Sequence, residues 1–371
     1  MKKLKIAGYQ GDGSVHTRSV KFFINKVSNY FNISLDQDIT EKGKKAASLI
    51  EMSMNNDIQM SYLWSSYYEK YIPEIKLLDL PFYFKNKNEV KSLINNNLQA
   101  YVSIELIKKN NLKLLGFWDN GSRHISTNNN IIKNQKSCEN LKIRTTPSPL
   151  HIDVFNELGF ISTPLDVRDF KIALKNDEID AQENPLTNYW NFGVQHKQKY
   201  LTLSSHLFGF CLFVINDTFF NGLSNHEKKI LTKASKDTSV YQYELAEQDD
   251  KKLITKELKI SLNNDLTSVV ILTGGTGLTG RDSTPEAVKE LIEKEIPGFG
   301  EIFRYISYKK IGTSSLQSRA MAGLAKNKFV FVLPGSPSAC RDAWEEILKY
   351  QLDSRTKPCN LVELIPRLNE K

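Results

Sequence analysis

Long apolar runs are missing from this sequence, and without one a helix cannot cross a bilayer. The longest apolar stretch, "LFGFCLFVI" (residues 207–215), is far shorter than the roughly 20 residues of a membrane-spanning helix, and it is typical of a buried strand. Cysteine is also scarce, and its four residues show no metal-type spacing: Cys138, Cys211, Cys340 and Cys359. The sequence therefore predicts neither a disulfide framework nor a zinc site.

Dense blocks of basic residues are absent as well. The formal net charge is +8, but acidic residues lie between the lysines along the chain, which indicates a solvated basic surface and argues against a nucleic-acid partner. The start of the chain, "MKKLKIAGYQGDG", has neither an apolar core of signal-peptide length nor a small-residue cleavage site. As written, the chain is therefore expected in the cytoplasm.

The composition is that of a large globular protein. With 371 residues, of which 40% are hydrophobic and 25% charged, the chain exceeds the size of one ordinary core, so two or more domains are expected. Strand-like "KLKIAGY", a helical run over residues 15–31, strand-like "NISLDQDI" and a helix near residues 44–54 follow one another. This alternation predicts an α/β fold with largely parallel sheets.

Several stretches in the first part of the chain carry a family resemblance. In order they are "LLDLPFYF", "LLGFWDNGSRHIST", "NLKIRTTPSP", "LKNDEIDAQENPLTNYW" and "QKYLTLSSH". Over about residues 4–260 they resemble the DctP-type solute-binding subunit of TRAP transporters. The resemblance implies that residues 1–260 form a periplasmic-binding-protein-like clamshell of two α/β lobes. Lobe I is expected at about residues 1–120 plus 207–260, and lobe II at about 121–206.

The same resemblance implies a site for a small organic acid that needs no cofactor. Arg144 in "KIR" matches the arginine that pairs with the ligand carboxylate, and Arg123 in "GSR" and Asn184 in "QENP" match residues that assist it. A guanidinium suits this role because it makes two parallel charge-assisted bonds to a carboxylate. From the residues alone, an ion pair of Arg144 with a nearby acid and a turn begun by Asn184 before Pro185 stay open. Exported members of the family work in the periplasm with TRAP membrane subunits.

The chain also departs from this family. Ala181 stands where the family usually has glycine, and the family's export signal is not recognisable. A helix that starts with the capping-box sequence "SNHE" at Ser224 leads through a charged run to Lys259. The family's closing strand and terminal helix do not follow, so the lobe is expected to be incomplete.

The character of the sequence changes near Leu266. "SVVILTGGTG" is typical of a buried strand that ends in a glycine turn. "DSTPEAVKELIEKEI" predicts a helix with Thr284 as its N-cap and Pro285 at its first position. Amides at a helix start hold anions, so the combination indicates a pocket for a phosphorylated ligand. A glycine turn alone is weak evidence, since many α/β proteins turn this way for packing.

Four further stretches make the C-terminal interpretation specific: "IPGFGEIFR", "IGTSSLQSRAMAG", "FVFVLPGSPSACRDAWEEIL" and "QLDSRTKPCN". Over about residues 266–360 they resemble the MoaB branch of the MoaB/Mog family of molybdenum-cofactor biosynthesis. The resemblance implies a three-layer αβα domain at residues 266–371, often trimeric, that binds molybdopterin and in active members adenylylates it with Mg-ATP. It assigns the molybdopterin pocket to Gly274, Gly275, Thr276, Gly277, Asp282, Ser318, Arg319, Pro334, Gly335 and Ser336.

Asp282 carries the enzymatic expectation. By resemblance it is the catalytic carboxylate, and its oxygens suit Mg²⁺. From the residues alone, an ion pair with Arg281 or a helix cap is the alternative. Family members have another strand-helix-strand unit ahead of the "TGGTG" strand, and solute-binding-type sequence occupies that place here. A truncated domain with an exposed apolar sheet edge is therefore expected, either as a homo-oligomer in which neighbours cover that edge or as an aggregation-prone domain, and its enzymatic activity is left open.

The whole chain is interpreted as a composite. Each part lacks the portion nearest the junction, so a joining of two genes or of two pieces of sequence data is favoured over a natural bifunctional fusion or a decayed gene with a scaffold role. The predicted function is solute binding for a small organic acid, joined to a partial molybdopterin-binding domain. The alternative is a MoaB-type molybdopterin adenylyltransferase with a binding-protein-like N-terminal extension.

Overall fold

The structure, a computed structural model, describes residues 1–84, 87–129, 131–278 and 283–370. It divides into two compact units, Met1–Ala246 (unit 1) and Glu247–Lys371 (unit 2). Among the described residues, no helix combines the length and the apolar character needed to cross a bilayer.

Unit 1 is built on one mixed sheet. Its strands are β1 (Lys2–Ala7), β2 (Phe31–Asp36), β3 (Met60–Trp64), β4 (Leu112–Thr127), β5 (Lys142–Thr145), β6 (Ile161–Pro164), β7 (Ala181–Pro185) and β8 (Tyr200–Asn216). They lie in the order β2-β1-β3-β8-β4-β7-β5-β6. β1 runs parallel to β2 and β3, and β5 runs parallel to β6 and β7, whereas the central strands pair antiparallel. The sheet is therefore parallel toward its two ends and antiparallel in its middle.

The two longest strands of unit 1, β4 and β8, connect its two lobes. They pair antiparallel from Leu112 opposite Asn216 to Thr127 opposite Tyr200. Their register shifts between Asp119 and Ser122, next to Gly121, which has a φ of 85° that favours glycine. Unit 1 is thus a clamshell of two α/β lobes joined by crossing strands, as the sequence analysis predicts.

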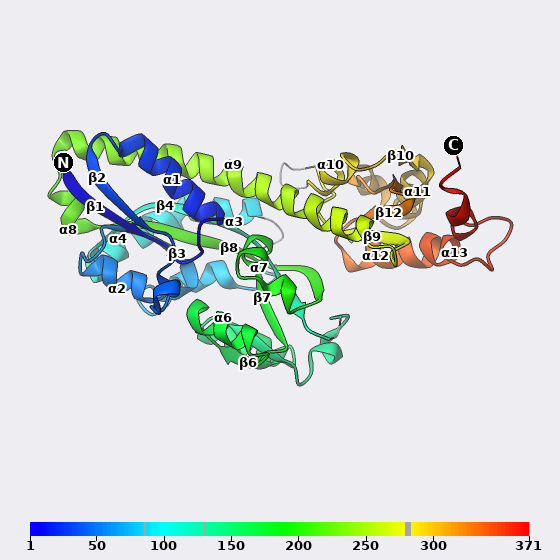
Figure 1. Cartoon of the computed structure of the whole chain (residues 1–371), viewed down its shortest axis with the longest axis horizontal. Helices are drawn as coiled ribbons and strands as arrows, with labels where there is room; N and C mark the ends of the chain where they lie inside the picture. Colours follow the sequence, from blue (N-terminus) through cyan, green and yellow to red (C-terminus); the bar gives the residue numbers. More distant parts are fainter. Residues whose placement is uncertain (85–86, 130, 279–282, 371) are drawn as a thin grey trace. The chain divides into compact units, whose positions relative to one another are not determined.

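Helices cover both faces of the first lobe. The helices of the two lobes are α1 (Val15–Val27), α2 (Ser48–Met54), α3 (Lys87–Leu93), α4 (Gln99–Asn110), α5 (Pro149–Glu157), α6 (Val167–Lys175), α7 (Leu186–Asn191), α8 (Asp217–Asn221) and α9 (Asn225–Asn263). Figure 1 shows α1 and α9 on one side of β1 to β3, and α2 and α4 on the other. The predicted capping box of α9 is confirmed, because the Ser224 amide donates to Glu227 Oε2 (2.7 Å) and the Glu227 amide donates to Ser224 Oγ (3.2 Å).

Unit 2 has three layers, helix on sheet on helix. Its strands are β9 (Val269–Thr273), β10 (Lys294–Glu295), β11 (Met321–Ala325) and β12 (Lys328–Leu333), and they lie in the order β10-β11-β12-β9. Its helices are α10 (Thr284–Lys289), α11 (Pro297–Ile311), α12 (Pro337–Ala343) and α13 (Lys349–Gln351). Phe329 and Phe331 of β12 pack with α11 on one face. The alternate residues Val330 and Val332 pack on the opposite face. The three-layer αβα prediction is therefore confirmed.

The end of helix α9 covers the second face of this sheet, which the sequence analysis does not predict. Leu258 and Leu262, near the end of α9, are buried in one cluster with Val288, Val330 and Val332. The preceding segment thus supplies a covering helix to unit 2 rather than a strand. β9 has β12 as its one strand neighbour among the described residues, and its Ile271 is 40% exposed, so the sheet has an edge where the sequence analysis expects one.

The helix predicted after the glycine turn differs from the observed one. α10 is capped by Ser283 rather than Thr284, without a side-chain capping bond, and it ends at Lys289. The following residues turn into the short strand β10, which pairs with β11. Pairing with the sheet outweighs the helix propensity of "ELIEKE" because it satisfies the backbone of this segment at a sheet edge.

Candidate functional sites

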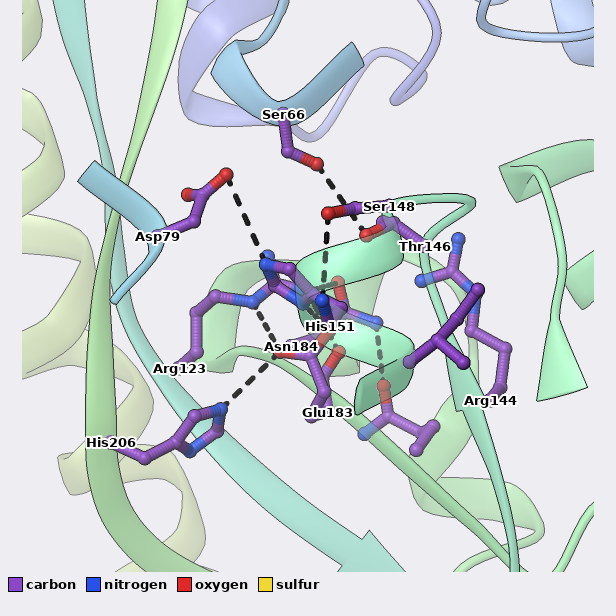
Figure 2. Close-up of polar contacts among 12 residues, drawn as sticks. Ser66, Asp79, Arg123, Arg144, Thr146, Ser148, His151, Glu183, Asn184 and His206 are labelled. Atoms are coloured by element: carbon purple, nitrogen blue, oxygen red, sulfur yellow. Dashed lines mark hydrogen bonds and ion pairs between the residues drawn. The ribbon is translucent and has the colours of Figure 1, made fainter. Parts of the chain in front are cut away.

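Polar side chains gather where the two lobes of unit 1 meet (Figure 2). From the first lobe they come from β3, η2 (Ser65–Tyr68) and η3 (Pro73–Asp79), and from the second lobe from β5, β7 and α5. Ser148 Oγ donates to Glu69 Oε2 at 2.6 Å, and Ser66 Oγ lies 3.5 Å from Thr146 Oγ1. The lobes therefore contact each other here through hydrogen-bonding groups.

Arg144 lies on β5 with 1% of its surface exposed. Its Nε and Nη2 donate to the carbonyl oxygen of Leu165 at 2.9 and 2.6 Å, and its guanidinium lies 4.8 Å from the centre of the Phe170 ring. No carboxylate among the described residues forms an ion pair with Arg144. Burial lowers the pKa of this guanidinium. A buried cation without an acidic partner is costly, so Arg144 suits an anionic ligand.

Arg123, on β4, is by contrast already neutralised within the chain. Its Nη2 donates to Oε1 of Glu183 at 2.7 Å and to the Glu183 carbonyl oxygen at 2.8 Å, while its Nε donates to Oε2 of the same residue. The guanidinium also lies 3.9 Å from the centre of the Trp64 ring. Burial by itself raises the pKa of Glu183, but the charge of Arg123 and the hydrogen bonds to the carboxylate hold it well below its usual range. Arg123 and Glu183 therefore form a buried ion pair.

Asn184 lies beside this pair on β7. Its Oδ1 is 3.4 Å from Nη2 of Arg123, and its Nδ2 donates to Gln182 Oε1 at 2.5 Å. Gln182 is in register with Arg144 of the neighbouring strand β5. The structure thus brings Arg123, Asn184 and Arg144 onto three adjacent strands, β4, β7 and β5.

Three further buried residues belong to this site: Trp64, Asp79 and His151. Sequence reasoning missed Asp79 and His151, and for the aromatic stretch "YLWSSYYEKYIPE" around Trp64 it left core packing and lining of a ligand cleft both open. His151 Nε2 lies 3.9 Å from Asp79 Oδ2, and its Nδ1 lies 4.0 Å from Glu183 Oε1. Burial raises the pKa of Asp79 well above its usual range and lowers the pKa of His151 to about 4. Both side chains therefore favour their neutral forms. Asp79 lies within the stretch "LLDLPFYF", and His151 lies two residues after "NLKIRTTPSP". Neither stretch indicates that the two side chains are close to each other in the fold.

In unit 2, the two glycine turns lie against each other. They follow β9 and β12, which are parallel neighbours, so the turns meet at the same end of the sheet. A Cβ at Gly335 would lie 3.1 Å from the Cα of Gly274, and Gly274 and Gly275 have φ values of 94° and 63°. These positions therefore require glycine. Pro334 and Ser336 flank Gly335, and Ser336 Oγ accepts from the Ala339 amide at 3.3 Å at the start of α12.

Of the remaining residues predicted for this pocket, Arg319 contacts the first turn from outside. The Arg319 amide donates to the Thr276 carbonyl oxygen at 3.3 Å, and its Nε donates to the Gly277 carbonyl oxygen at 2.7 Å. Its Nη1 forms an ion pair with Glu286. Ser318 Oγ accepts from the amide of Ala320 at 3.3 Å. Asp282, the predicted catalytic carboxylate, lies with Arg281 outside the described residues.

The glycine turns fit molybdopterin, a flat ligand with a phosphate group. Without side chains at Gly274 and Gly335, the backbone of both turns can approach such a ligand closely. A cavity of about 320 Å³ is lined by residues of α10, α11 and β11 together with Arg319, and none of the glycines of the two turns is among its lining residues. The described residues contain no group of three or more side chains suited to hold a metal ion.

Comparison with known proteins assigns most of the chain to one family. Residues 11–266 match the family model of bacterial extracellular solute-binding proteins, family 7. The 2,3-diketo-L-gulonate-binding periplasmic protein YiaO of Escherichia coli is 26% identical over 263 residues, which are 70% of this chain and 77% of that protein. The sugar acid binding protein DctPAm of Advenella mimigardefordensis, solved in complex with galactonate, is similar with a TM-score of 0.66 at 22% identity, covering 70% of this chain and 85% of that one. A TRAP periplasmic solute-binding protein of Polaromonas sp. JS666 bound to D-erythronate has a TM-score of 0.66 at 20% identity, covering 85% and 97%.

A second match covers the end of the chain. Residues 211–354 match the model of a probable molybdopterin binding domain, which overlaps the first match over residues 211–266. The molybdenum cofactor biosynthesis protein B of Escherichia coli is 49% identical over 113 residues, which are 30% of this chain and 66% of that protein. The same protein of Staphylococcus aureus (strain N315) is 50% identical over 107 residues, 29% and 63% of the two chains. This chain thus spans slightly less than two thirds of these relatives. The predicted resemblance of its two parts to two different families is confirmed.

Proposed function

Because the chain belongs to the bacterial extracellular solute-binding proteins of family 7, we propose that unit 1 holds the carboxylate of a small organic acid on Arg144. The observation that carries this proposal is the contrast between the two buried arginines. Arg123 is neutralised by Glu183, whereas Arg144 donates only to a backbone carbonyl oxygen among the described residues. Arg144 therefore has charge and hydrogen-bond donors left for a ligand. Asn184 and Arg123 lie on the next two strands of the sheet, β7 and β4. The solved neighbours bind galactonate, D-erythronate and L-malate, which are acids of this class.

Binding of an acid should stabilise unit 1 against heat. A ligand at a hundred times its dissociation constant adds about 2.7 kcal/mol to the free energy of unfolding, which for a unit of this size raises the melting temperature by about 5–10 °C. Differential scanning fluorimetry with a panel of organic acids checks this. Galactitol, which has hydroxyl groups but no carboxylate, is the control and should give no shift. A panel without any shift would contradict the proposal.

The partners and the location of the chain follow from the same proposal. As a transport protein, unit 1 would deliver its ligand to TRAP membrane subunits, which requires the periplasm where the family works. The cytoplasmic location expected from the sequence would instead favour the function of unit 2. Cell fractionation distinguishes the two, because recovery from the periplasm is compatible only with solute delivery.

The glycine turns favour a second function, molybdopterin binding by unit 2. Gly274, Gly275, Thr276 and Gly277 would contact the ligand from one turn and Pro334, Gly335 and Ser336 from the other, with Ser318 and Arg319 behind them. When bound with Mg-ATP, molybdopterin supplies the phosphate that active family members adenylylate, and Asp282 is the proposed Mg²⁺ ligand. The open edge at β9, with Ile271 40% exposed, supports a homo-oligomer through unit 2, which light scattering tests.

Unit 2 is expected to bind molybdopterin but to adenylylate it slowly or not at all, because catalysis requires close alignment of groups that part of the family domain normally supplies. Fluorescence titration measures binding, and chromatography of the pterin after incubation with Mg-ATP measures turnover. Gly335→Ala should weaken binding, because its Cβ would lie 3.1 Å from the Cα of Gly274, whereas at Gly298, the control position, a Cβ meets nothing within 4 Å. Turnover that Asp282→Ala abolishes would contradict the expected inactivity.

A further inference from the structure

Five buried polar atoms at the junction of the two lobes have no hydrogen-bond partner among the described residues: Trp64 Nε1, both carboxylate oxygens of Asp79 and both ring nitrogens of His151. These side chains are 3%, 1% and 2% exposed. They are close neighbours, because His151 Nε2 lies 3.9 Å from Asp79 Oδ2 and the ring centres of Trp64 and His151 are 5.2 Å apart. Buried polar atoms are nearly always hydrogen-bonded in folded proteins, so this cluster indicates a ligand position.

The chemistry of the five atoms defines the groups that would satisfy them. Trp64 Nε1 can only donate, whereas the neutral carboxyl group of Asp79 and the neutral ring of His151 can each donate once and accept at their other polar atom. A hydroxyl group donates and accepts at once, so hydroxyl groups on neighbouring carbons would pair with all three side chains. An aliphatic chain would leave every one of these atoms unpaired, which costs free energy for each buried group.

The charges around the cluster limit the ligand to one carboxylate. Glu183 already neutralises Arg123, and Arg144 is close enough for its charge to act on His151. Arg144 therefore balances one ligand carboxylate. A second carboxylate near His151 would have no cation left to balance it, and it would lie close to the ionised Glu183, whose Oε1 is 4.0 Å from Nδ1 of the imidazole. Like charges at such distances repel each other.

We propose that Trp64, Asp79 and His151 form a hydroxyl-binding subsite, and that the ligand of unit 1 is a monocarboxylate that carries several hydroxyl groups. This inference rests on the proposed function, because Arg144 holds the carboxylate while the hydroxyl groups reach the subsite. It goes further in that it assigns a selectivity to three residues whose roles differ from that of Arg144.

Calorimetric titration of the full chain with matched acids tests the selectivity. Galactonate and hexanoate share a six-carbon chain, erythronate and butyrate share a four-carbon chain, and in each pair only the first acid has hydroxyl groups. Because each lost hydrogen bond to a buried group costs about tenfold in affinity, the better-fitting hydroxy acid should bind at least about 100-fold more tightly than its hydroxyl-free partner. Galactarate, with the hydroxyl groups and a second carboxylate, should bind more weakly than galactonate.

Two variants locate the effect. Asp79→Leu and Trp64→Phe, which remove the polar atoms, should each weaken binding of the hydroxy acid about tenfold while changing hexanoate or butyrate binding less than about twofold. Asp177→Asn, the control, removes an exposed carboxylate and should change neither. The unliganded melting temperature of the variants checks that they fold.

The outcomes separate this inference from the proposed function. Equal affinity within each pair, together with loss of all binding in Arg144→Ala, overturns the subsite and keeps the carboxylate site. Strong selectivity that Asp79→Leu and Trp64→Phe leave unchanged also overturns the subsite. If no acid of either pair binds, both proposals fail.

Discussion

Arg144→Ala should weaken binding of the organic acid by about 30-fold to several thousand-fold, because truncating one partner of a desolvated charge pair costs roughly 2–5 kcal/mol. The guanidinium is 1% exposed and, among the described residues, donates only to the Leu165 carbonyl oxygen, so the ligand loses its main cationic partner in this variant. Isothermal titration calorimetry with the best acid of the thermal screen measures the change.

The control for this variant removes the same group from an exposed position. Arg355 is 88% exposed and pairs with Asp353, so Arg355→Ala should leave the affinity for the acid unchanged. Arg144→Lys should recover only part of the affinity, since an ammonium cannot make the two parallel bonds of a guanidinium. An Arg144→Ala variant that binds like the parent would mean that the carboxylate lies elsewhere.

Glu183→Gln should destabilise unit 1 by about 3–5 kcal/mol, because it leaves the buried guanidinium of Arg123 without its carboxylate. The two side chains are 1% and 0% exposed, so water cannot replace the lost partner. Urea denaturation followed by far-ultraviolet circular dichroism gives the free energy of unfolding.

A double variant distinguishes this ion pair from a general defect at the site. Arg123→Met combined with Glu183→Leu removes both charges and should be much more stable than Glu183→Gln alone, since no buried charge is left unpaired. The pair would be unimportant for folding if Glu183→Gln cost less than about 1 kcal/mol, or if the double variant were the least stable.

The sequence was sufficient to predict the two-lobed fold. It also pointed to Arg144, Arg123 and Asn184, because each lies in a local motif on a strand, and their assignment to the ligand stays a prediction. It could not separate the roles of the two arginines. That difference depends on Glu183, which is adjacent to Asn184 in sequence yet pairs across the sheet with Arg123. Asp79 and His151 come from different lobes, and only the packing of one lobe on the other brings them within 3.9 Å.

The limits of prediction in unit 2 have a similar cause. α9 carries a charged run, but its Leu258 and Leu262 are spaced one helical turn apart and are buried against the sheet. Their spacing was visible in the sequence, whereas the surface that they cover was not. The close approach of Gly274 and Gly335 likewise depends on β9 and β12 being neighbours, which separate sequence segments do not reveal.

A crystal structure of the chain with galactonate, or with the acid that binds best, tests the central claim most directly. The carboxylate is expected within hydrogen-bonding distance of the Arg144 guanidinium, with hydroxyl groups on Asp79, His151 and Trp64. The ion pair between Arg123 and Glu183 should stay intact. A ligand bound away from Arg144, or one whose carboxylate displaces Glu183 from Arg123, would contradict the claim.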